Sequence, residues 1–334
     1  MATTTVSPEE FRTRFAALQQ ELAGVIVGQQ TVVNELLIAF FAEGHVLLEG
    51  VPGLGKTLLA KSFAKTLGVT FKRVQCTPDL MPADILGTEL VVDRDGRKVF
   101  EFSPGPVFTH VLLADELNRA TPKTQSALLE AMAEHQVTVS GRTYALDEPF
   151  FVIATQNPLE MEGVYSLPEA QLDRFLFRIL VTYPTPEELG RILRQTTVVN
   201  APEPKQILPE QSQAWILGAQ RLVREVLVAK PVEEYVVQLV TATRPDTGSS
   251  DGARRLIRYG ASPRGAQAIL MGAKVLALVR GRVNVSFEDV DEVAIAALNH
   301  RVILSFEAEA ERRTSWDILR ELLEPLKSRA SAAA

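Results

Sequence analysis

Cysteine and histidine are scarce in this sequence of 334 residues. Cys76 is the only cysteine, so no disulfide can form within the chain. The four histidines, at positions 45, 110, 135 and 300, lie far apart, and no Cys/His group has the spacing of zinc ligands. The sequence therefore predicts a fold without a structural zinc, held together by the hydrophobic core that a chain of this length can bury.

Long apolar runs and dense basic runs are also missing. The most apolar stretch, Leu36–Leu48, contains Glu43 and His45 and is too short to span a bilayer. The segment Met1–Glu10 carries two acids and no apolar centre, unlike a signal peptide. The formal net charge is −6 without a Lys/Arg cluster, so nucleic acid is not the expected partner. We expect a soluble, cytoplasmic protein without a transmembrane segment.

What the sequence does contain is an alternation of short apolar runs and amphipathic segments. Helical spacing of apolar residues predicts helices over Ser7–Gly24, Gln30–Phe41 and Lys56–Leu67. Apolar runs bounded by turn residues predict buried strands over 45–49, 70–74, 111–114, 150–154 and 177–181. Strands that alternate with helices indicate an α/β fold, in which helices cover both faces of a parallel sheet.

Two segments interrupt that alternation and predict β-hairpins. Leu90–Phe102 has apolar runs on both sides of Asp95-Gly96, a dipeptide that suits a tight turn. Val137–Leu146 has the same design around Gly141. Both hairpins are expected as insertions between strands of the parallel sheet.

A proline-rich segment, Tyr183–Glu188, marks a change in the pattern. The chain beyond it is almost entirely helical, with helices predicted over 212–228, 233–243, 263–280 and 286–300. We therefore divide the chain into a core (1–185), a linker (186–205), a smaller α-helical domain (206–327) and a disordered tail (328–334).

The most specific motif is Gly50-Val-Pro-Gly-Leu-Gly-Lys-Thr57, which fits G-x-x-x-x-G-K-T between a predicted strand and a predicted helix. Glycines allow backbone N–H groups to surround phosphate oxygens, and the helix directs its N-terminus at the anion. Lys56 would reach the β- and γ-phosphates of ATP, and Thr57 would ligate Mg²⁺. An ordinary glycine-rich turn is the alternative, which the strand and helix around the motif disfavour.

An acidic pair ends the predicted strand over 111–114. Asp115 would lie at the carboxyl edge of the sheet, beside the phosphate site, and would hold Mg²⁺ through water. Glu116 would act as the general base that polarises the attacking water. A solvated acidic pair at a strand end is the common alternative, and the P-loop upstream favours the catalytic one.

Other polar residues carry weaker signals. Asn157 follows the strand over 150–154 and could orient the water or touch the γ-phosphate, although Asn-Pro is a normal turn. Arg174, or Arg178 one turn later, could stabilise charge on the transferring phosphoryl group, but from chemistry alone a surface arginine in a salt bridge is the favoured alternative. Arg264 lies in the first turn of a predicted helix, where a positive charge is unfavourable because the N-terminal end of the helix dipole is positive. A phosphate partner elsewhere would explain an arginine at this position.

Taken together, these segments resemble the MoxR family of AAA+ ATPases over roughly residues 8–325. The motifs that carry the resemblance, besides the P-loop, are Val27–Gln29, Gln75–Pro82, Asp84–Gly87, Gly105–Phe108, Ala114–Arg119, Leu128–Met132, Ala154–Pro158, Leu167–Arg178 and Gly260–Gly265. The resemblance implies an AAA+ P-loop αβα core with inserted hairpins and a C-terminal helical lid.

The resemblance also implies roles for single residues. Asp115 and Glu116 correspond to Walker B, Asn157 to sensor 1 and Arg264 to sensor 2. Arg174 corresponds to an arginine finger that acts on the ATP of a neighbouring subunit. Gln75 stands where the family's switch residue contacts Glu116. The residues expected to bind ATP and Mg²⁺ are Val27, Gly28, Gly50, Val51, Pro52, Gly53, Leu54, Gly55, Lys56, Thr57, Leu58 and Asp115.

At the level of function, the resemblance implies a homo-oligomeric ring, expected to be a hexamer, that remodels or matures a client protein, for example by cofactor or metal insertion. A separate protein with a von Willebrand A domain is the expected partner. The near-match Asp246–Ser250 to that domain's metal motif is interpreted as a loop. The hairpins would face the pore or cover a seam between subunits. The ATPase subunit of a metal chelatase, a nucleic-acid motor and a non-catalytic adaptor remain as alternatives.

Overall fold

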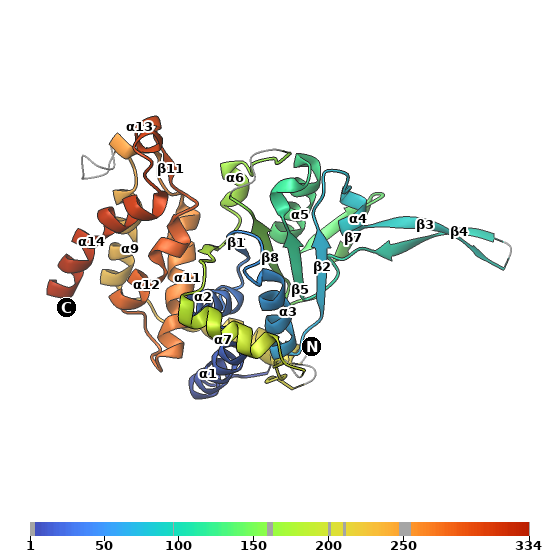
Figure 1. The fold of residues 1–334 in the computed structure, drawn as a ribbon, viewed down its shortest axis with the longest axis horizontal. Coiled ribbons are helices and arrows are strands. Elements are labelled where there is room, and N and C mark those ends of the chain that lie inside the picture. Colours follow the sequence, from blue (N-terminus) through green and yellow to red (C-terminus); the bar gives the residue numbers. More distant parts are fainter. Residues whose placement is uncertain are drawn as a thin grey trace.

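The chain folds into an α/β part and a mainly helical C-terminal part that lie side by side (Figure 1). The computed structural model describes residues 4–95, 97–158, 163–199, 202–209, 212–246 and 255–333, and only the backbone beyond residue 326. Within these stretches, every helix is too short or too polar to cross a membrane. Residues 247–250 of the predicted loop Asp246–Ser250 lie outside the described residues.

Five parallel strands form the central sheet, in the order β2-β5-β8-β1-β9. They are β1 (Val46–Glu49), β2 (Phe71–Gln75), β5 (Val111–Asp115), β8 (Phe151–Gln156) and β9 (Phe177–Leu180). Successive side chains of a strand join two different hydrophobic clusters, as Val46 and Leu48 join one and Leu47 the other. Both faces are thus covered, and the predicted parallel sheet is confirmed at all five strands.

Different helices cover the two faces. One face packs against α1 (Pro8–Val25), α2 (Gln30–Phe41) and α3 (Lys56–Leu67), and the other against α4 (Pro82–Leu86) and α5 (Pro122–Glu134). The α1 helix begins where the sequence predicted, because the Ser7 hydroxyl accepts a hydrogen bond of 3.1 Å from the N–H of Glu10. These helices fix the loops at the carboxyl edge of the sheet.

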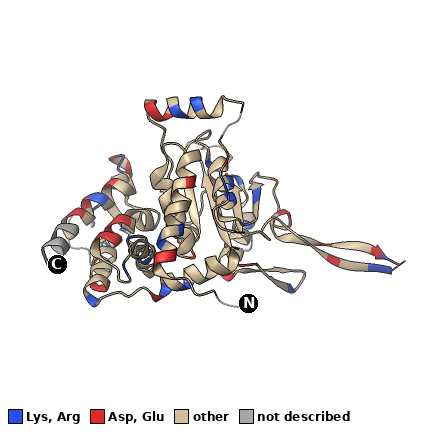
Figure 2. Ribbon diagram, turned by 90° about the horizontal axis from the view of Figure 1, so that it is seen from below, with Lys and Arg blue, Asp and Glu red and all other residues tan. Residues whose placement is uncertain are grey.

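Both predicted hairpins are present. The first consists of β3 (Gly87–Arg94) and β4 (Arg97–Pro104), and it projects far from the body of the molecule (Figures 1 and 2). The second consists of β6 (Gln136–Val139) and β7 (Arg142–Ala145). The rings of Phe102 and Tyr144 stack at 3.9 Å, so the base of the first hairpin rests on the second.

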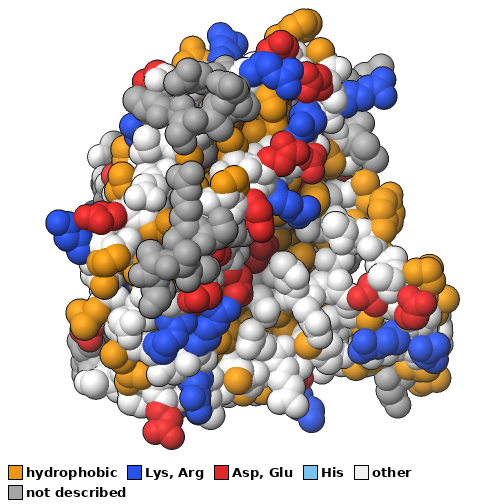
Figure 3. Space-filling view, turned by 90° about the vertical axis from the view of Figure 1, so that its left-hand side faces the viewer, with side chains coloured by type: hydrophobic (Ala, Val, Ile, Leu, Met, Phe, Trp, Pro, Cys, Tyr) orange, Lys and Arg blue, Asp and Glu red, His pale blue; other side chains and the backbone are white. Residues whose placement is uncertain are grey.

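The C-terminal part contains the helices α8 (Gln213–Glu225), α9 (Lys230–Ala242), α11 (Pro263–Val279), α12 (Phe287–Leu298), α13 (Phe306–Ala310) and α14 (Ser315–Ala333), with the short strands β10 (Ile257–Tyr259) and β11 (Ile303–Leu304). Trp215 of α8 lies edge-on to Phe41 of α2, with ring centres 6.0 Å apart, so α8 packs on the core. Figure 3 shows the face of this part, where described basic and acidic side chains lie next to one another.

Two predicted boundaries differ from the structure. The segment predicted as a linker contains the helix α7 (Pro186–Thr196), because Pro186 occupies the first turn and Thr185 with Glu188 forms a capping box. None of the α7 residues is buried, and the helix stands away from the body at the top of Figure 2. The backbone of α14 is helical to Ala333, where a disordered tail was predicted, in keeping with the high helix propensity of alanine.

Candidate functional site

The P-loop Gly50–Thr57 joins β1 to α3 at the carboxyl edge of the sheet. Gly53 and Gly55 have φ angles of 86° and 78°, a left-handed conformation that side chains rarely adopt. No side chain caps the first turn of α3, whose N–H groups point into the loop. The Lys56 ammonium donates to the Gly50 carbonyl at 2.5 Å, which draws it across the loop that a phosphate would enter.

The oxygen atoms of Thr57 and Asp115 meet beside this loop. Thr57 Oγ1 lies 3.4 Å from Asp115 Oδ2, although the two residues come from different elements. Thr155 of β8 donates to Asp115 Oδ1 at 2.6 Å and accepts from the N–H of Glu116 at 2.8 Å, so it fixes both acidic residues. Mg²⁺ binds proteins through one or two carboxylates together with the phosphates of a substrate. One hydroxyl and one carboxylate, from Thr57 and Asp115, fit that pattern. Among the described residues, no group of three His, Cys, Asp or Glu side chains could hold a metal ion by itself.

Glu116 follows β5 in a left-handed conformation, with φ of 57°. Its Oε2 accepts from Gln75 at 2.7 Å and from Arg119 at 3.0 Å, so the expected contact with Gln75 is present. Arg73, which the sequence did not single out, donates to both Asp115 and Gln75. The carboxylate of Glu116 is thus held within a polar network that spans β2 and β5.

The single cysteine, Cys76, lies buried at the same end of the sheet. Burial, together with the charges of Asp115 and Glu116, raises the pKa of the Cys76 thiol to about 12. The single cysteine is therefore a protonated, buried group rather than a nucleophile. Asn157 directly follows β8, the strand that carries Thr155, and is buried at the same edge.

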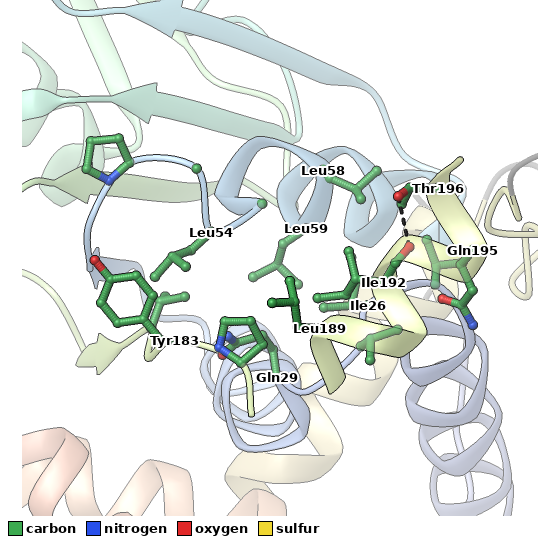
Figure 4. Close-up of a pocket in the computed structure, with 17 residues that line it drawn as sticks. Ile26, Gln29, Leu54, Leu58, Leu59, Tyr183, Leu189, Ile192, Gln195 and Thr196 are labelled. Atoms are coloured by element: carbon green, nitrogen blue, oxygen red, sulfur yellow. Dashed lines mark hydrogen bonds between the residues drawn. The ribbon is translucent and has the colours of Figure 1, made fainter. Parts of the chain in front are cut away.

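An apolar pocket of about 430 Å³ opens beside the P-loop (Figure 4). Of the residues predicted to bind nucleotide, Val27, Pro52, Gly53, Leu54, Gly55 and Leu58 line it. Gly28 is outside the lining, and a side chain there would collide with Glu188 of α7 at 2.7 Å. On the opposite side, α7 contributes Leu189, Ile192, Gln195 and Thr196, which sequence reasoning missed because it treated 186–205 as a linker.

The arginines predicted to act on phosphate lie elsewhere. Arg174 and Arg264 line a second hollow, of about 420 Å³, together with Asp173 and Arg301. Arg174 is exposed and donates to the Leu129 carbonyl at 2.6 Å, and Arg264 is 57% exposed, with Nη1 3.6 Å from Asp173. Arg178 instead forms an ion pair with Glu49 inside the sheet.

Arg264 is predicted from the resemblance to act at the nucleotide site of its own chain, and this stays a prediction. Arg264 does not line the apolar pocket beside the P-loop. The reason is the docking of α11: the Ser262 hydroxyl donates to Asp173, and Arg301 binds Asp173 Oδ1 at 2.7 Å. These bonds hold the start of α11 beside Arg174, on the side of the molecule where the second hollow lies.

Comparison with known proteins agrees with this architecture. A family model described as "ATPase family associated with various cellular activities (AAA)" matches residues 45–177, and a model of the AAA lid domain matches residues 251–322. Chaperone MoxR1 of Mycobacterium tuberculosis is 46% identical over 91% of this chain and 79% of its own length. Protein MoxR of Methylorubrum extorquens is 33% identical over 94% of this chain and 95% of its own. A crystal structure of a Cytophaga hutchinsonii protein superposes with a TM-score of 0.86 at 42% identity, covering 95% of each chain.

Proposed function

Since this chain belongs to the MoxR family of AAA+ ATPases, we propose that it hydrolyses Mg–ATP in an oligomeric ring and uses the energy to remodel a client protein. The observation that carries the proposal is the meeting of three segments at one sheet edge: the P-loop, the acidic pair and Asn157. The distance of 3.4 Å between Thr57 Oγ1 and Asp115 Oδ2 shows how near the P-loop and the acidic pair lie to each other. The proposed ATPase activity agrees with the AAA family model, and the proposed chaperone-like role agrees with the name of the relative Chaperone MoxR1.

In the proposed reaction, the chain's own residues position phosphate, water and protons. Backbone N–H groups of Gly50–Thr57 cradle the phosphates, and Lys56 turns from the Gly50 carbonyl to the β- and γ-phosphates. Thr57 and Asp115 would hold Mg²⁺, which neutralises charge on the phosphates. Glu116 accepts a proton from the attacking water, and Asn157 orients that water.

The apolar pocket suits the adenine ring of ATP. Its walls come from Val25–Val27 at the end of α1, from the P-loop and from α7, and aliphatic side chains predominate among them. Since α7 buries no residue of its own, a bound base would give its apolar face a partner. Gly28 would act here by allowing Glu188, and with it the start of α7, to approach.

Arg174 and Arg264 would serve the ATP of a neighbouring subunit. The two arginines share one hollow, and that hollow is separate from the pocket beside the P-loop. Arginines that neutralise transition-state charge contribute on the order of 10³–10⁵ in rate. A ring, which we propose to be a hexamer, would bring this hollow against the next P-loop through heterologous contacts. An isolated subunit would then bind ATP and hydrolyse it poorly.

The client and the partner are proposed from the resemblance to the family and not from the site. We propose a cytoplasmic system in which the client matures, for example by cofactor or metal insertion, with the help of a protein that has a von Willebrand A domain. The β3–β4 hairpin would meet the client, because Val91 is 57% and Phe100 is 70% exposed on it. The formal net charge of −6 argues against a nucleic-acid motor, and described charges of both signs lie next to one another on the face in Figure 3.

The test starts with substitutions in the P-loop and the acidic pair. Lys56→Ala should abolish ATP binding, while Lys61→Ala, an exposed lysine later on the same helix, should leave it intact. Glu116→Gln should bind ATP and retain it unhydrolysed. Unchanged affinity in Lys56→Ala, or normal turnover in Glu116→Gln, would overturn the proposed site.

The contribution between subunits needs a mixing experiment. Arg174→Ala should bind ATP normally and fail to hydrolyse it. Mixing it with Glu116→Gln subunits should restore part of the activity, because some interfaces then pair an intact Glu116 with an intact Arg174. No recovery at any ratio would contradict action in trans. Affinity capture with ATP-loaded Glu116→Gln then tests for a partner with a von Willebrand A domain.

A further inference from the structure

Arg73 lies among the acidic side chains at the end of the sheet, and the roles proposed so far leave it unused. It stands two residues before Gln75 on β2, so both side chains leave the same face of the strand, next to β5. The Arg73 side chain is 44% exposed, and the Asp115 side chain with which it pairs is 11% exposed. A cation is therefore built into the proposed metal site.

The two oxygens of Asp115 have different partners. Oδ1 accepts from Thr155 at 2.6 Å. Oδ2 accepts from Arg73 Nε at 3.1 Å and from Arg73 Nη2 at 2.7 Å, and it is also the oxygen nearest to Thr57. The oxygen that faces the metal-binding hydroxyl is thus the one whose charge Arg73 neutralises.

The same guanidinium reaches Glu116 through Gln75. Arg73 Nη2 donates to Gln75 Oε1 at 2.5 Å, and Gln75 Nε2 donates to Glu116 Oε2 at 2.7 Å. Because an amide has one accepting end and one donating end, Arg73 determines which end of Gln75 faces Glu116. Asp115 and Glu116 are in this way connected through one arginine.

We propose that Arg73 is a positioning residue that couples metal binding at Asp115 to the release of Glu116. The inference rests on the proposed function. Arg73 and Mg²⁺ compete for Asp115 Oδ2, because two cations at one oxygen repel each other. With Mg²⁺ held at Asp115, Arg73 would withdraw and Gln75 would lose the bond that orients it. Glu116 would then keep only its bond to Arg119 and could turn to the attacking water. Without the metal, Glu116 stays held by Gln75.

The experiment is a Mg²⁺ titration of the full chain with a fluorescent, non-hydrolysable ATP analogue. Arg73→Met should reach half-maximal binding at a Mg²⁺ concentration about two- to fivefold lower than wild type, the range for a partly exposed charged pair. Arg73→Lys keeps the charge without the fork and should fall between them. Lys72→Met removes the same charge from the neighbouring residue of β2, on the opposite face, and should leave the midpoint unchanged.

The outcomes separate this inference from the proposed function. An Arg73→Met midpoint equal to that of wild type, or higher, would overturn the competition. Absence of analogue binding by wild type at any Mg²⁺ concentration would instead overturn the proposed function. The link to Glu116 is read from hydrolysis at limiting Mg²⁺, where Gln75→Ala should raise the rate of wild type but not of Arg73→Met. If Gln75→Ala changes the rate equally in wild type and in Arg73→Met, Gln75 does not link Arg73 to Glu116.

Discussion

Replacing Glu35 by glutamine should stabilise the protein increasingly as the pH rises from 5.5 to 7.5. Glu35 lies on α2 and is partly buried. Burial, and secondarily the negative charge of Glu292 on α12, raises the pKa of its carboxyl from 4.5 to about 8. Between these two values the folded chain keeps the proton and the unfolded chain releases it. The free energy of unfolding therefore falls as the pH rises through this window.

The size of the effect follows from the proton balance. One proton bound only in the folded state changes the free energy of unfolding by about 1.4 kcal/mol per pH unit. Over two pH units within the window, wild type should lose about 2.7 kcal/mol through this group. Glu35→Gln cannot ionise and should not show this loss. Glu292→Gln removes only the second cause and should recover a smaller part of it.

Urea unfolding at pH 5.5, 6.5 and 7.5 measures the difference between variant and wild type. Burial lowers the pKa of His45 to about 4 and also lowers the pKa of His300. The two histidines therefore make the free energy of unfolding rise with pH up to their ordinary pKa of 6.5. Both histidines are present in both proteins, so their contributions cancel in the difference. Glu233→Gln, at an exposed position of α9, is the control and should show a constant difference. A constant difference for Glu35→Gln as well would refute the reasoning.

Three further substitutions test other parts of the molecule. Asp289→Asn should lower the free energy of unfolding by about 1–3 kcal/mol in urea, because this fully buried carboxylate binds two arginines that would lose a charged partner. Ile192→Ala should weaken nucleotide binding several-fold in a fluorescence titration, whereas Leu193→Ala, outside the pocket lining, should not. Tyr144→Ala should speed proteolysis of the β3–β4 hairpin, since the ring that stacks on Phe102 is lost; an unchanged cleavage rate would contradict that support.

Local signals account for the elements that the sequence predicted well. Gln30–Phe41 and Lys56–Leu67 were predicted at the bounds that α2 and α3 have, because apolar residues recur along both segments and glycines cap both ends of α3. The prolines around α7 were misinterpreted as a break. A proline in the first turn of a helix costs no hydrogen bond, so Thr185-Pro186 was a start signal instead.

The network around the acidic pair shows what the sequence could not provide. Asp115 and Glu116 are recognisable because the strand and the pair are contiguous. Arg73 and Thr155 become their partners only through the order of strands, which sets β2 and β8 on the two sides of β5. A residue's identity and its neighbours in the chain carry no information about that order. The signal that could have found Arg73 was its spacing of two residues from Gln75 on one strand face.

The docking of the C-terminal part depends on tertiary contacts in the same way. Asp173 accepts from Ser262 and pairs with Arg264 and Arg301, so the positive charge at the start of α11 lies next to Arg174. The Arg301 side chain is 3% exposed in its pair with Asp173, whereas Arg264 is 57% exposed and 3.6 Å from the same carboxylate. An exposed pair of this kind contributes little to stability, so Arg264 can leave Asp173 at small cost while Arg301 keeps α11 in place. If Arg264 and Arg174 act on the ATP of a neighbouring subunit, as we propose, hydrolysis should increase with the concentration of subunits.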